Sequence, residues 1–582
     1  FDPKRIRLIP GINLDDRLRS VPGFSLFRRS SGIVAHPTTQ GVSLRGIGSS
    51  GASRSLVLWD GIPANDPFGG WVYWTRFAPE EVSRIEISRG ASTSVFGDRA
   101  LGGAIALFSP EPERRHFRAS YEAGNENSHD VSAGYSDLWP RFGVSAFGRA
   151  FTTGGYFIIP ASRRGSIDRP AGVRFVSSNA RADYFGSADR LYFKTDILVE
   201  DRQNGTPIQT NSTALGTVSL RYQREAGGHN VSLLGFHTRE EFRSGFSAIA
   251  ASRNTETLSY RQTVPAEATG GALVWGLPRR QWNLLGGADV FRVAGTSTDS
   301  LFPAGKRIGG GTLLQHGVFL QGDASVGIAK FFAGARHQFA GQDEKFFSPS
   351  AGAVLGRGRV RARGSVYRSF RAPTLNELYR EFRAGNAVTQ ANPQLRPETL
   401  FGAEAGFDFA GETTRARLTF YRNQLRDLIT NVTLQSTPAL IVRQRRNAAE
   451  ALNRGVEFDA ARRFGPIRGE MGYLFVDSRF GNARRVPQIP RHQGSALVAF
   501  EKNGTLVTAG VRSFAAQFED ELNTFVLGGF ATVQVLLRQR LTPHLSAVAA
   551  FENLLDREYL TGFSPTPTIG APRLWRIGLR WQ

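Results

Sequence analysis

Apolar and polar residues alternate along many segments of the chain after about residue 113. The pattern is clear in residues 117–122, 191–199, 416–421 and 575–581, where every second side chain is apolar. A period of two predicts β-strands whose two faces differ in polarity. The sequence therefore predicts an extensive sheet with one apolar and one polar face.

One segment indicates what those two faces contact. In residues 359–369, one face carries small and aliphatic residues and the other carries arginines and a tyrosine: Val360, Ala362, Gly364 and Val366 against Arg359, Arg361, Arg363 and Tyr367. This is the pattern of a lipid-facing wall behind a polar lumen. No uninterrupted apolar run approaches the ~20 residues of a membrane-spanning helix, so strands closed into a barrel are expected to span the membrane.

Composition agrees with this fold. The 582 residues include 65 glycines, 11% aromatic residues and no cysteine. Glycines and aromatics suit tight turns and interfacial girdles, whereas the lack of cysteine excludes disulfides and thiolate-ligated metals. A single methionine argues against a thioether copper site, so no metal site and no cofactor are expected.

The net charge of +22 would favour nucleic acid in a soluble protein. Here the basic residues are almost all arginines, and many occupy alternate strand positions instead of one basic block. Arginines can line a lumen or bind the phosphates of lipopolysaccharide at the outer rim. Outer-membrane lipid is therefore expected as a partner and nucleic acid is not, although codon composition explains the arginine excess equally well.

Ordered motifs in residues 40–109 resemble the plug domain of the TonB-dependent outer-membrane receptors. They are VSLRG (42–46), LVLWDGIP (56–63), RIEISRG (84–90) and SVFGDRALGG (94–103). Further segments resemble barrel elements of the same family, in the same order: SFRAPTLNELY (369–379), NPQLRPE (392–398), GVEFDA (455–460), FENLLDREY (551–559) and GAPRLWRIGLRW (570–581). The resemblance thus covers nearly the whole chain.

The resemblance implies an all-β membrane protein, a 22-stranded antiparallel transmembrane β-barrel with an N-terminal α+β plug domain inside the lumen. We expect the plug in residues 1–112 and the barrel in residues 113–582. The remaining length gives roughly 21 residues per strand with its turn, which suits strands of ~10 residues. The location implied is the outer membrane of a Gram-negative bacterium. The chain starts at Phe1 without the family's TonB box or signal peptide, and we expect both to precede it.

Local signals add detail. Asn13 is expected to cap a helix that stops at Pro22, and Pro79 to begin a second helical turn. Residues 434–451 break the alternation and predict a long loop.

No catalytic constellation is evident. The nine histidines have no metal-binding spacing, and the glycines at 46, 48 and 51 precede an apolar strand instead of the helix that a dinucleotide site needs. The chain is therefore not expected to be an enzyme. Haem uptake is also disfavoured, because haem receptors of this kind place a histidine between motifs that match Phe370 and Leu395, and here that interval has none.

The expected function is TonB-dependent import of a scarce solute, with TonB acting through the N-terminal box. A ferric siderophore is the leading cargo, since an arginine-lined lumen suits an anionic metal chelate. A cobalamin-type nutrient is the alternative cargo. An uncoupled barrel with a structural or adhesive role is the alternative of another class.

The resemblance also implies a plug–barrel latch. Arginines of the LRG and RIExxRG motifs face barrel glutamates in the family, and the matching residues are Arg45 and Arg89 with Glu404 and Glu457. Glu86 is expected to share the cluster. The alternative is that these charges face solvent in the lumen.

Ligand contacts are expected at three plug turns, residues 34–39, 49–53 and 65–74. The third turn offers an exposed aromatic platform, and polar residues from all three turns would add contacts: Phe68, Trp71, Tyr73 and Trp74, with His36, Ser50, Asn65 and Asp66. Arg371 is a weaker candidate for binding an anionic group. The alternative is that the four rings pack against the barrel wall as plug core.

Overall fold

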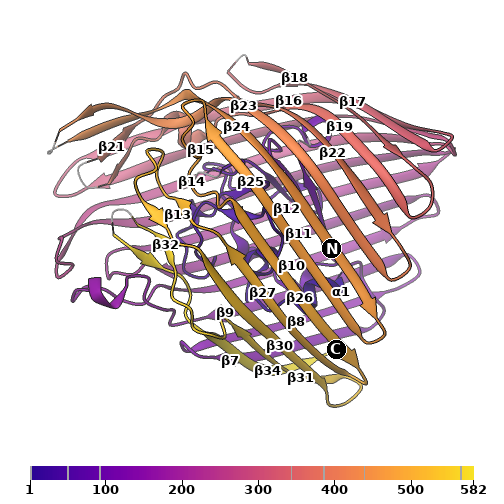
Figure 1. The fold of residues 1–582 in the computed structure, drawn as a ribbon, viewed down its shortest axis with the longest axis horizontal. Coiled ribbons are helices and arrows are strands. Elements are labelled where there is room, and N and C mark those ends of the chain that lie inside the picture. The colour runs from indigo at the N-terminus through magenta and orange to yellow at the C-terminus, as the bar shows by residue number, and fades with distance from the viewer. Residues whose placement is uncertain are drawn as a thin grey trace.

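A computed structural model describes residues 3–48, 52–90, 93–342, 344–384, 387–437, 440–563 and 566–582. Residues 49–51 of the expected apical turn, Ser50 among them, lie outside the described residues. Figure 1 shows a wide barrel of tilted strands with the N-terminal part of the chain enclosed in it. No helix in the described ranges is long and apolar enough to cross a membrane.

The described part of the chain forms a closed antiparallel barrel of 22 strands, in which β34 pairs with β7. The strands are β7 (His116–Gly124), β8 (Ser128–Leu138), β9 (Phe142–Thr152), β10 (Gly172–Phe185), β11 (Asp189–Gln203), β12 (Thr210–Ala226), β13 (His229–Ile249), β14 (Glu256–Pro278), β15 (Trp282–Leu301), β16 (Lys306–Val326), β17 (Ala329–Phe339), β18 (Lys345–Leu355), β19 (Val360–Arg371), β22 (Glu398–Ala410), β23 (Thr414–Ser436), β24 (Ile441–Phe464), β25 (Ile467–Phe480), β26 (His492–Lys502), β27 (Thr505–Phe514), β30 (Phe530–Arg540), β31 (Leu545–Glu552) and β34 (Leu574–Trp581). This architecture confirms the expected fold class.

The two ends of the barrel differ. Tight turns such as residues 541–544 join strands at one end, hereafter the short-turn end, where the C-terminus lies (Figure 1). Longer connections such as residues 153–171 and 553–573 mark the opposite, long-loop end. Short elements belong to these connections: η4 (Ala161–Arg163), α4 (Leu375–Tyr379), β20 (Phe382–Ala384), β21 (Ala387–Gln390), β28 (Gln517–Phe518), β29 (Val526–Leu527), β32 (Leu560–Gly562) and β33 (Thr568–Ile569).

The alternation of the sequence corresponds to an outer and an inner face. Val360 and Val366 of β19 are exposed on the outside, while Arg363 on the same strand pairs with Glu404 and Asp408 in the lumen. Strand β34 follows the same rule, with exposed Trp575, Ile577, Leu579 and Trp581 alternating with Arg576 and Arg580, whose side chains bind Glu122 inside the wall.

The plug fills the lumen with short elements around its own apolar core. They are α1 (Pro3–Leu8), α2 (Leu14–Leu18), β1 (Ser25–Leu26), η1 (Pro37–Thr39), β2 (Val42–Ser43), β3 (Leu56–Trp59), β4 (Ile62–Pro63), η2 (Trp74–Arg76), η3 (Pro79–Glu81), β5 (Arg84–Arg89), α3 (Thr93–Phe96) and β6 (Gly103–Phe108). Strands β4, β3, β6 and β5 form a mixed sheet, in which β3 and β6 are parallel. Leu14, Val57, Trp74 and Ile105 are among the fully buried residues of the core.

Local signals were partly correct. Asn13 caps α2 in a capping box with Asp16, and Pro79 begins η3, as predicted. The predicted loop at residues 434–451 is wrong, because β23 continues to Ser436 and β24 begins at Ile441. Strand pairing between β23 and β24 overrides the weak local pattern there.

The plug and the barrel meet in a short connection. Strand β6 ends at Phe108 and β7 begins at His116. The proposed division into a plug of residues 1–112 and a barrel of residues 113–582 falls within this connection.

Candidate functional site

Two sets of ion pairs join the plug to the barrel wall, and the first contains the residues expected to form a latch. Arg45 follows β2 and donates to both oxygens of Glu457, at 3.1 and 3.0 Å, while its third nitrogen lies 2.5 Å from Glu404. Burial acts to lower the pKa of Arg45, but the carboxylates of Glu457 and Glu404 outweigh it and hold that pKa well above its ordinary value. Arg45 is therefore a permanent cation with two anionic partners.

Arg89, at the end of β5, extends this group. Its guanidinium lies 2.8 Å from Asp459 and 3.5 Å from Glu457 on β24. Asp459 was not among the predicted latch residues, although it stands in the GVEFDA motif two positions after Glu457 and therefore on the same face of the strand. Arg45, Arg89, Glu404, Glu457 and Asp459 are hereafter the latch.

Glu86 does not belong to the latch, which corrects the expectation. Its side chain is exposed and pairs with Arg84 at 3.2 Å. The cause is strand parity, because Glu86 and Arg89 are three residues apart on β5 and so point to opposite faces.

The latch borders a cavity of about 1100 Å³ between the plug and the wall at the short-turn end. The turn residues Arg359 and Glu412 line it together with Arg463, which stands next to the end of β24. Its described lining includes eleven arginines and seven carboxylates. The latch therefore faces an aqueous, predominantly cationic space.

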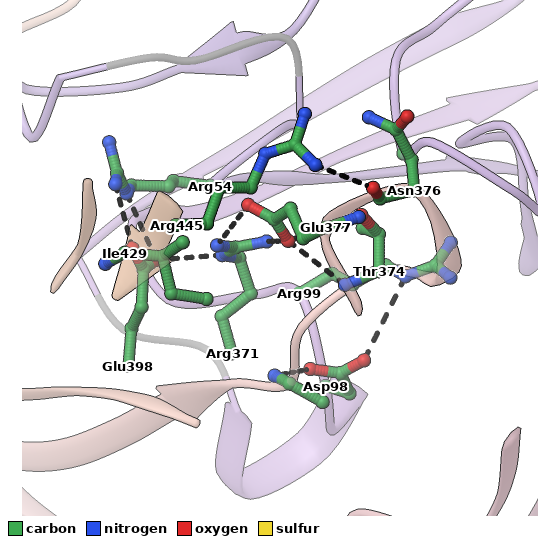
Figure 2. Close-up of polar contacts among 12 residues, drawn as sticks. Arg54, Asp98, Arg99, Arg371, Thr374, Asn376, Glu377, Glu398, Ile429 and Arg445 are labelled. Carbon is green, nitrogen blue, oxygen red and sulfur yellow. Dashed lines mark hydrogen bonds and ion pairs between the residues drawn. The ribbon is translucent and has the colours of Figure 1, made fainter. Parts of the chain in front are cut away.

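The second set lies at the long-loop end, its side chains are buried, and Figure 2 shows its polar contacts. Arg54 of the plug donates to both oxygens of Glu398, at 3.0 and 2.7 Å, where β22 begins. Arg371, at the end of β19, reaches the same carboxylate at 2.7 Å and binds Glu377 of α4 at 2.9 and 3.0 Å. Arg54, Arg371, Glu377 and Glu398 are hereafter the clamp.

Backbone groups complete the clamp. The amide of Ile429 donates to Glu398 at 2.8 Å, and Glu377 accepts from the amide of Thr374 at 2.9 Å in a capping box that starts α4. Buried carboxylates keep their charge only when such donors surround them. Sequence reasoning missed this cluster, although three of its four residues stand in the quoted barrel motifs.

A third contact involves Asp60 in the DGIP turn of the plug. Lys194 of β11 lies 2.6 Å from Asp60 and 3.9 Å from the ring centroid of Trp59. Burial acts to raise the pKa of Asp60, but Lys194 and the hydrogen bonds from Ser109 outweigh it, so that this pKa is lowered. Asp60 is thus ionised and tied to the wall.

The four aromatic residues of the third plug turn are not exposed, which corrects the expected platform. Phe68, Trp71, Tyr73 and Trp74 are each at most 3% exposed. Trp74 packs edge-on against Phe24 inside the plug core, whereas the other rings face the barrel wall. Their packing instead matches the alternative interpretation, in which the four rings pack against the barrel wall as part of the plug core.

Tyr73 shows why the wall encloses this turn. Its hydroxyl donates to Glu240 of β13 at 2.7 Å, and the neighbouring Trp71 lies 6.2 Å from the ring of Phe242 on the same strand. The lumen-facing residues of β13 thus occupy the space that a ligand would need.

The polar candidates are also engaged within the protein. Asn65 accepts from the amide of Val57 at 2.9 Å, and Asp66 is buried and accepts from the amide of Gly69. Arg371, expected as a weak anion contact, is 1% exposed and saturated by the clamp. These three side chains therefore stabilise the folded plug and wall, and they are not available to a bound solute.

His36 is the half-buried exception among the candidates. It caps η1, its Nδ1 lies 2.8 Å from the Thr38 hydroxyl, and its Nε2 lies 3.3 Å from Ser244 of β13. Burial, together with Arg202 and Arg380, lowers the pKa of His36 to about 3, so the ring is neutral at physiological pH. In the described part of the chain, no three His, Asp or Glu side chains are grouped so that they could ligate a metal ion.

Similar proteins agree with this architecture. Residues 1–104 match the model of the TonB-dependent Receptor Plug Domain, and residues 111–554 match the TonB dependent receptor-like β-barrel. A hemin receptor of Yersinia enterocolitica is 27% identical over 441 residues, which are 67% of this chain and 60% of that protein. The matched region therefore spans less than two thirds of the relative's length.

Solved structures share the fold at low sequence identity. The siderophore receptor PirA from Acinetobacter baumannii has a TM-score of 0.82 at 15% identity, covering 100% of this chain and 97% of its own. The copper transporter OprC has a TM-score of 0.83 at 15% identity, covering 100% and 98%. This barrel is characteristic of Gram-negative outer-membrane proteins. Because the two family models together account for most of its length, the chain belongs to the TonB-dependent receptors.

Proposed function

We propose that the protein imports a scarce anionic metal chelate, a ferric siderophore, across the outer membrane with energy supplied through TonB. The observation that carries this proposal is a plug that fills the lumen while ion pairs beside water hold it in place. A solute can pass only if the plug moves, and paired charges next to an aqueous cavity can exchange partners with water. Outer-membrane barrels have short turns on the periplasmic side, so the short-turn end is expected to face the periplasm.

The charge of the cavity supports an anionic cargo. Its lining has four more arginines than carboxylates, and arginines such as Arg361 and Arg415 project into it from the lumen face of the wall. A wall of one sign raises the local concentration of solutes of the opposite sign. A carboxylate- or catecholate-bearing iron chelate fits this path better than a cationic solute.

Hemin is a second candidate, because the curated relative is a hemin receptor and because His36 is a neutral imidazole. Neutral imidazole is a common ligand of haem iron. Arg380, close enough to lower the pKa of His36, would suit a propionate. Against this candidate, both ring nitrogens of His36 already have partners, so that Ser244 would first have to release Nε2.

Uptake of radiolabelled cargo by whole cells distinguishes these functions. The receptor is expressed with its native leader in a strain that lacks its own iron receptors, and ferric siderophores, hemin and a labelled corrinoid are supplied separately. The proposal expects saturable siderophore uptake that disappears in a strain without TonB. Hemin or corrinoid uptake alone would replace the cargo, and no TonB-dependent uptake of any of the three would favour the structural or adhesive role.

Substitution of His36 separates the two iron sources. His36→Ala should leave siderophore uptake within about twofold and should abolish hemin uptake if His36 ligates haem iron. His544→Ala, which changes an exposed histidine at the short-turn end, is the matched control.

A further inference from the structure

Two buried acidic side chains meet where the third plug turn contacts β13, Asp66 of the plug and Glu240 of the wall. Asp66 is 1% exposed and Glu240 is 3% exposed. The two side chains form a hydrogen bond with each other across the interface. Ionised carboxylates have only acceptor oxygens, so a hydrogen bond between two carboxyl groups needs a proton on one of them.

The other hydrogen bonds of the two groups leave one oxygen of each for that proton. The Oδ1 atom of Asp66 accepts from the amide of Gly69, and the Oε1 atom of Glu240 accepts from the Tyr73 hydroxyl at 2.7 Å. Asp66 Oδ2 and Glu240 Oε2 are both enclosed, and among the described residues no donor group reaches either atom. One shared proton satisfies both atoms, whereas two ionised groups would satisfy neither.

The charged groups around the pair are engaged with other partners. Those that face Asp66 or Glu240 from the neighbouring elements make the following contacts: Arg99 with Asp98, Glu200 with Arg202, and Arg76 with Thr217. In the described part of the chain the pair thus has no salt-bridge partner, unlike Glu398, which Arg54 binds at 2.7 Å. A proton is therefore the remaining means of reducing its charge.

Desolvation favours such a proton. Two like charges in a dry site repel each other strongly, so one of the two groups keeps its proton. Burial raises the pKa of Asp66, while the hydrogen bonds from Glu240 and from the Gly69 amide act to lower it. These donors make Asp66 the better place for the single negative charge and Glu240 the better place for the proton.

The charge of Asp66 acts on the whole turn. Its amide donates to the carbonyl of Trp71 at 2.7 Å, and its carbonyl accepts from the amide of Gly70 at 3.0 Å. Phe68, in the same turn, packs in one apolar cluster with Phe242 of β13. Repulsion between Asp66 and the wall would therefore pull a packed segment away and not one side chain alone.

We propose that Asp66 and Glu240 share one proton across the plug–wall interface and that loss of this proton releases the third plug turn from β13. The unfolded chain gives up the corresponding proton at about pH 4. Stability at this contact should consequently fall as the pH rises towards the value at which the folded pair ionises. This proton-dependent contact is distinct from the ion pairs of the latch and the clamp, and it does not depend on which solute is carried.

Infrared spectroscopy of the purified full-length receptor tests the shared proton, because a protonated carboxyl has a C=O stretch that an ionised carboxylate lacks. Wild-type protein near neutral pH should show this band, and Glu240→Gln and Asp66→Asn should each lose the part that belongs to the pair. An amide at either position can donate to the remaining carboxylate, so both variants should fold. Glu241→Gln, one residue further along β13 and exposed, is the matched control and should keep the band.

A cysteine on the wall tests release of the turn. The chain has no cysteine of its own. Ala266 of β14 pairs with Glu240 in the sheet, is 5% exposed, and belongs to the same apolar cluster as Phe68. Maleimide labelling of Ala266→Cys should rise with pH by up to about tenfold more per pH unit than labelling of the same variant carrying Glu240→Gln, a comparison that cancels ionisation of the thiol.

Two results would overturn the proposal directly. One is an equal C=O band in the wild type and in both amide variants, and the other is labelling of Ala266→Cys that rises with pH equally with and without Glu240. A rise in labelling when a chelator is added at constant pH would also overturn it, because a divalent cation, and not a proton, would then join the two carboxylates.

Discussion

The clamp and the latch are built from the same pair of residue types but in different surroundings. In the clamp, Glu398 and Arg371 are at most 1% exposed and each is held by two charged partners. In the latch, Glu404 and Arg89 are 14% and 15% exposed, Asp459 is 35% exposed, and a water-accessible cavity adjoins them. We propose that the same chemistry gives one fixed and one exchangeable attachment of the plug.

The difference follows from desolvation. A buried pair that loses one partner leaves an uncompensated charge, whereas a charge beside water is hydrated instead. In the proposed transport cycle, the pull arrives through the N-terminal end of the plug, and α1 packs beside the short-turn end, where Leu8 contacts Leu506. We expect the latch to open first, while the clamp keeps the long-loop side of the plug in place.

Loss of the clamp carboxylate should have the largest effect. Glu398→Gln leaves Arg54 and Arg371 with a neutral amide in a dry site, at a cost of about 3–5 kcal/mol in the stability of the plug–barrel assembly. Urea unfolding followed by limited proteolysis of the plug measures this loss. Glu412→Gln, on the exposed turn after β22, is the control and should change stability by less than about 0.5 kcal/mol.

Removal of the central latch arginine should have an intermediate effect. Arg45→Ala deletes contacts to Glu404 and Glu457, but Arg363 and Arg89 still pair with those carboxylates and the cavity admits water. A loss of about 2 kcal/mol is expected, with faster plug proteolysis and greater sensitivity to hydrophilic antibiotics.

Arg361→Ala is the control for the latch, because Arg361 lines the same cavity from the same strand as Arg363. It should preserve both proteolysis rate and antibiotic resistance. Equal sensitivity in the two variants would mean that the cavity's overall charge, and not the latch, retains the plug.

The barrel and the latch could be predicted from sequence for a clear reason. Alternation of period two marks many of the barrel strands, and the lumen face of β19 is marked by its arginines. The latch arginines stand in short plug motifs whose resemblance to a family already implies their partners. Glu86 was misplaced because motif proximity was given more weight than the parity of β5.

The clamp and the aromatic turn could not be predicted in the same way. Arg54 and Glu398 are 344 residues apart, and only closure of the barrel brings them together. The rings of Trp71 and Tyr73 stand in a Gly-Pro turn that looks exposed locally, but Glu240 and Phe242 of a distant strand cover it. Burial at a plug apex is therefore a property of the wall, which the plug sequence does not contain.

Acidification should have a smaller effect on stability, and this effect should depend on His36 and not on a histidine at the short-turn end. The pKa of His36 is about 3 in the folded protein, below the ~6.5 of an unfolded histidine, so the unfolded chain binds an extra proton between these values. Stability should consequently fall as the pH is lowered through this window, by about 1 kcal/mol between pH 6.5 and 5.5.

Thermal unfolding of His36→Gln across this pH range checks the assignment. The variant should lose that part of the acid sensitivity, whereas His544→Gln, at the exposed short-turn end, should retain it. Identical pH profiles for His36→Gln and wild type would show that His36 is protonated equally in both states.

The smallest effect is expected at the most exposed member of the latch. Asp459→Asn removes a 2.8 Å contact to Arg89, but Arg89 keeps Glu457 at 3.5 Å and water replaces the lost carboxylate. Exposed pairs of this kind contribute about 0.5 kcal/mol, and added salt should reduce the difference further. Urea unfolding of Asp459→Asn and Glu398→Gln at low and high ionic strength compares the loss of unfolding free energy in the latch with that in the clamp. A loss for Asp459→Asn as large and as salt-insensitive as that for Glu398→Gln would mean that the latch is as dry as the clamp, and the distinction between a fixed and an exchangeable attachment would then be wrong.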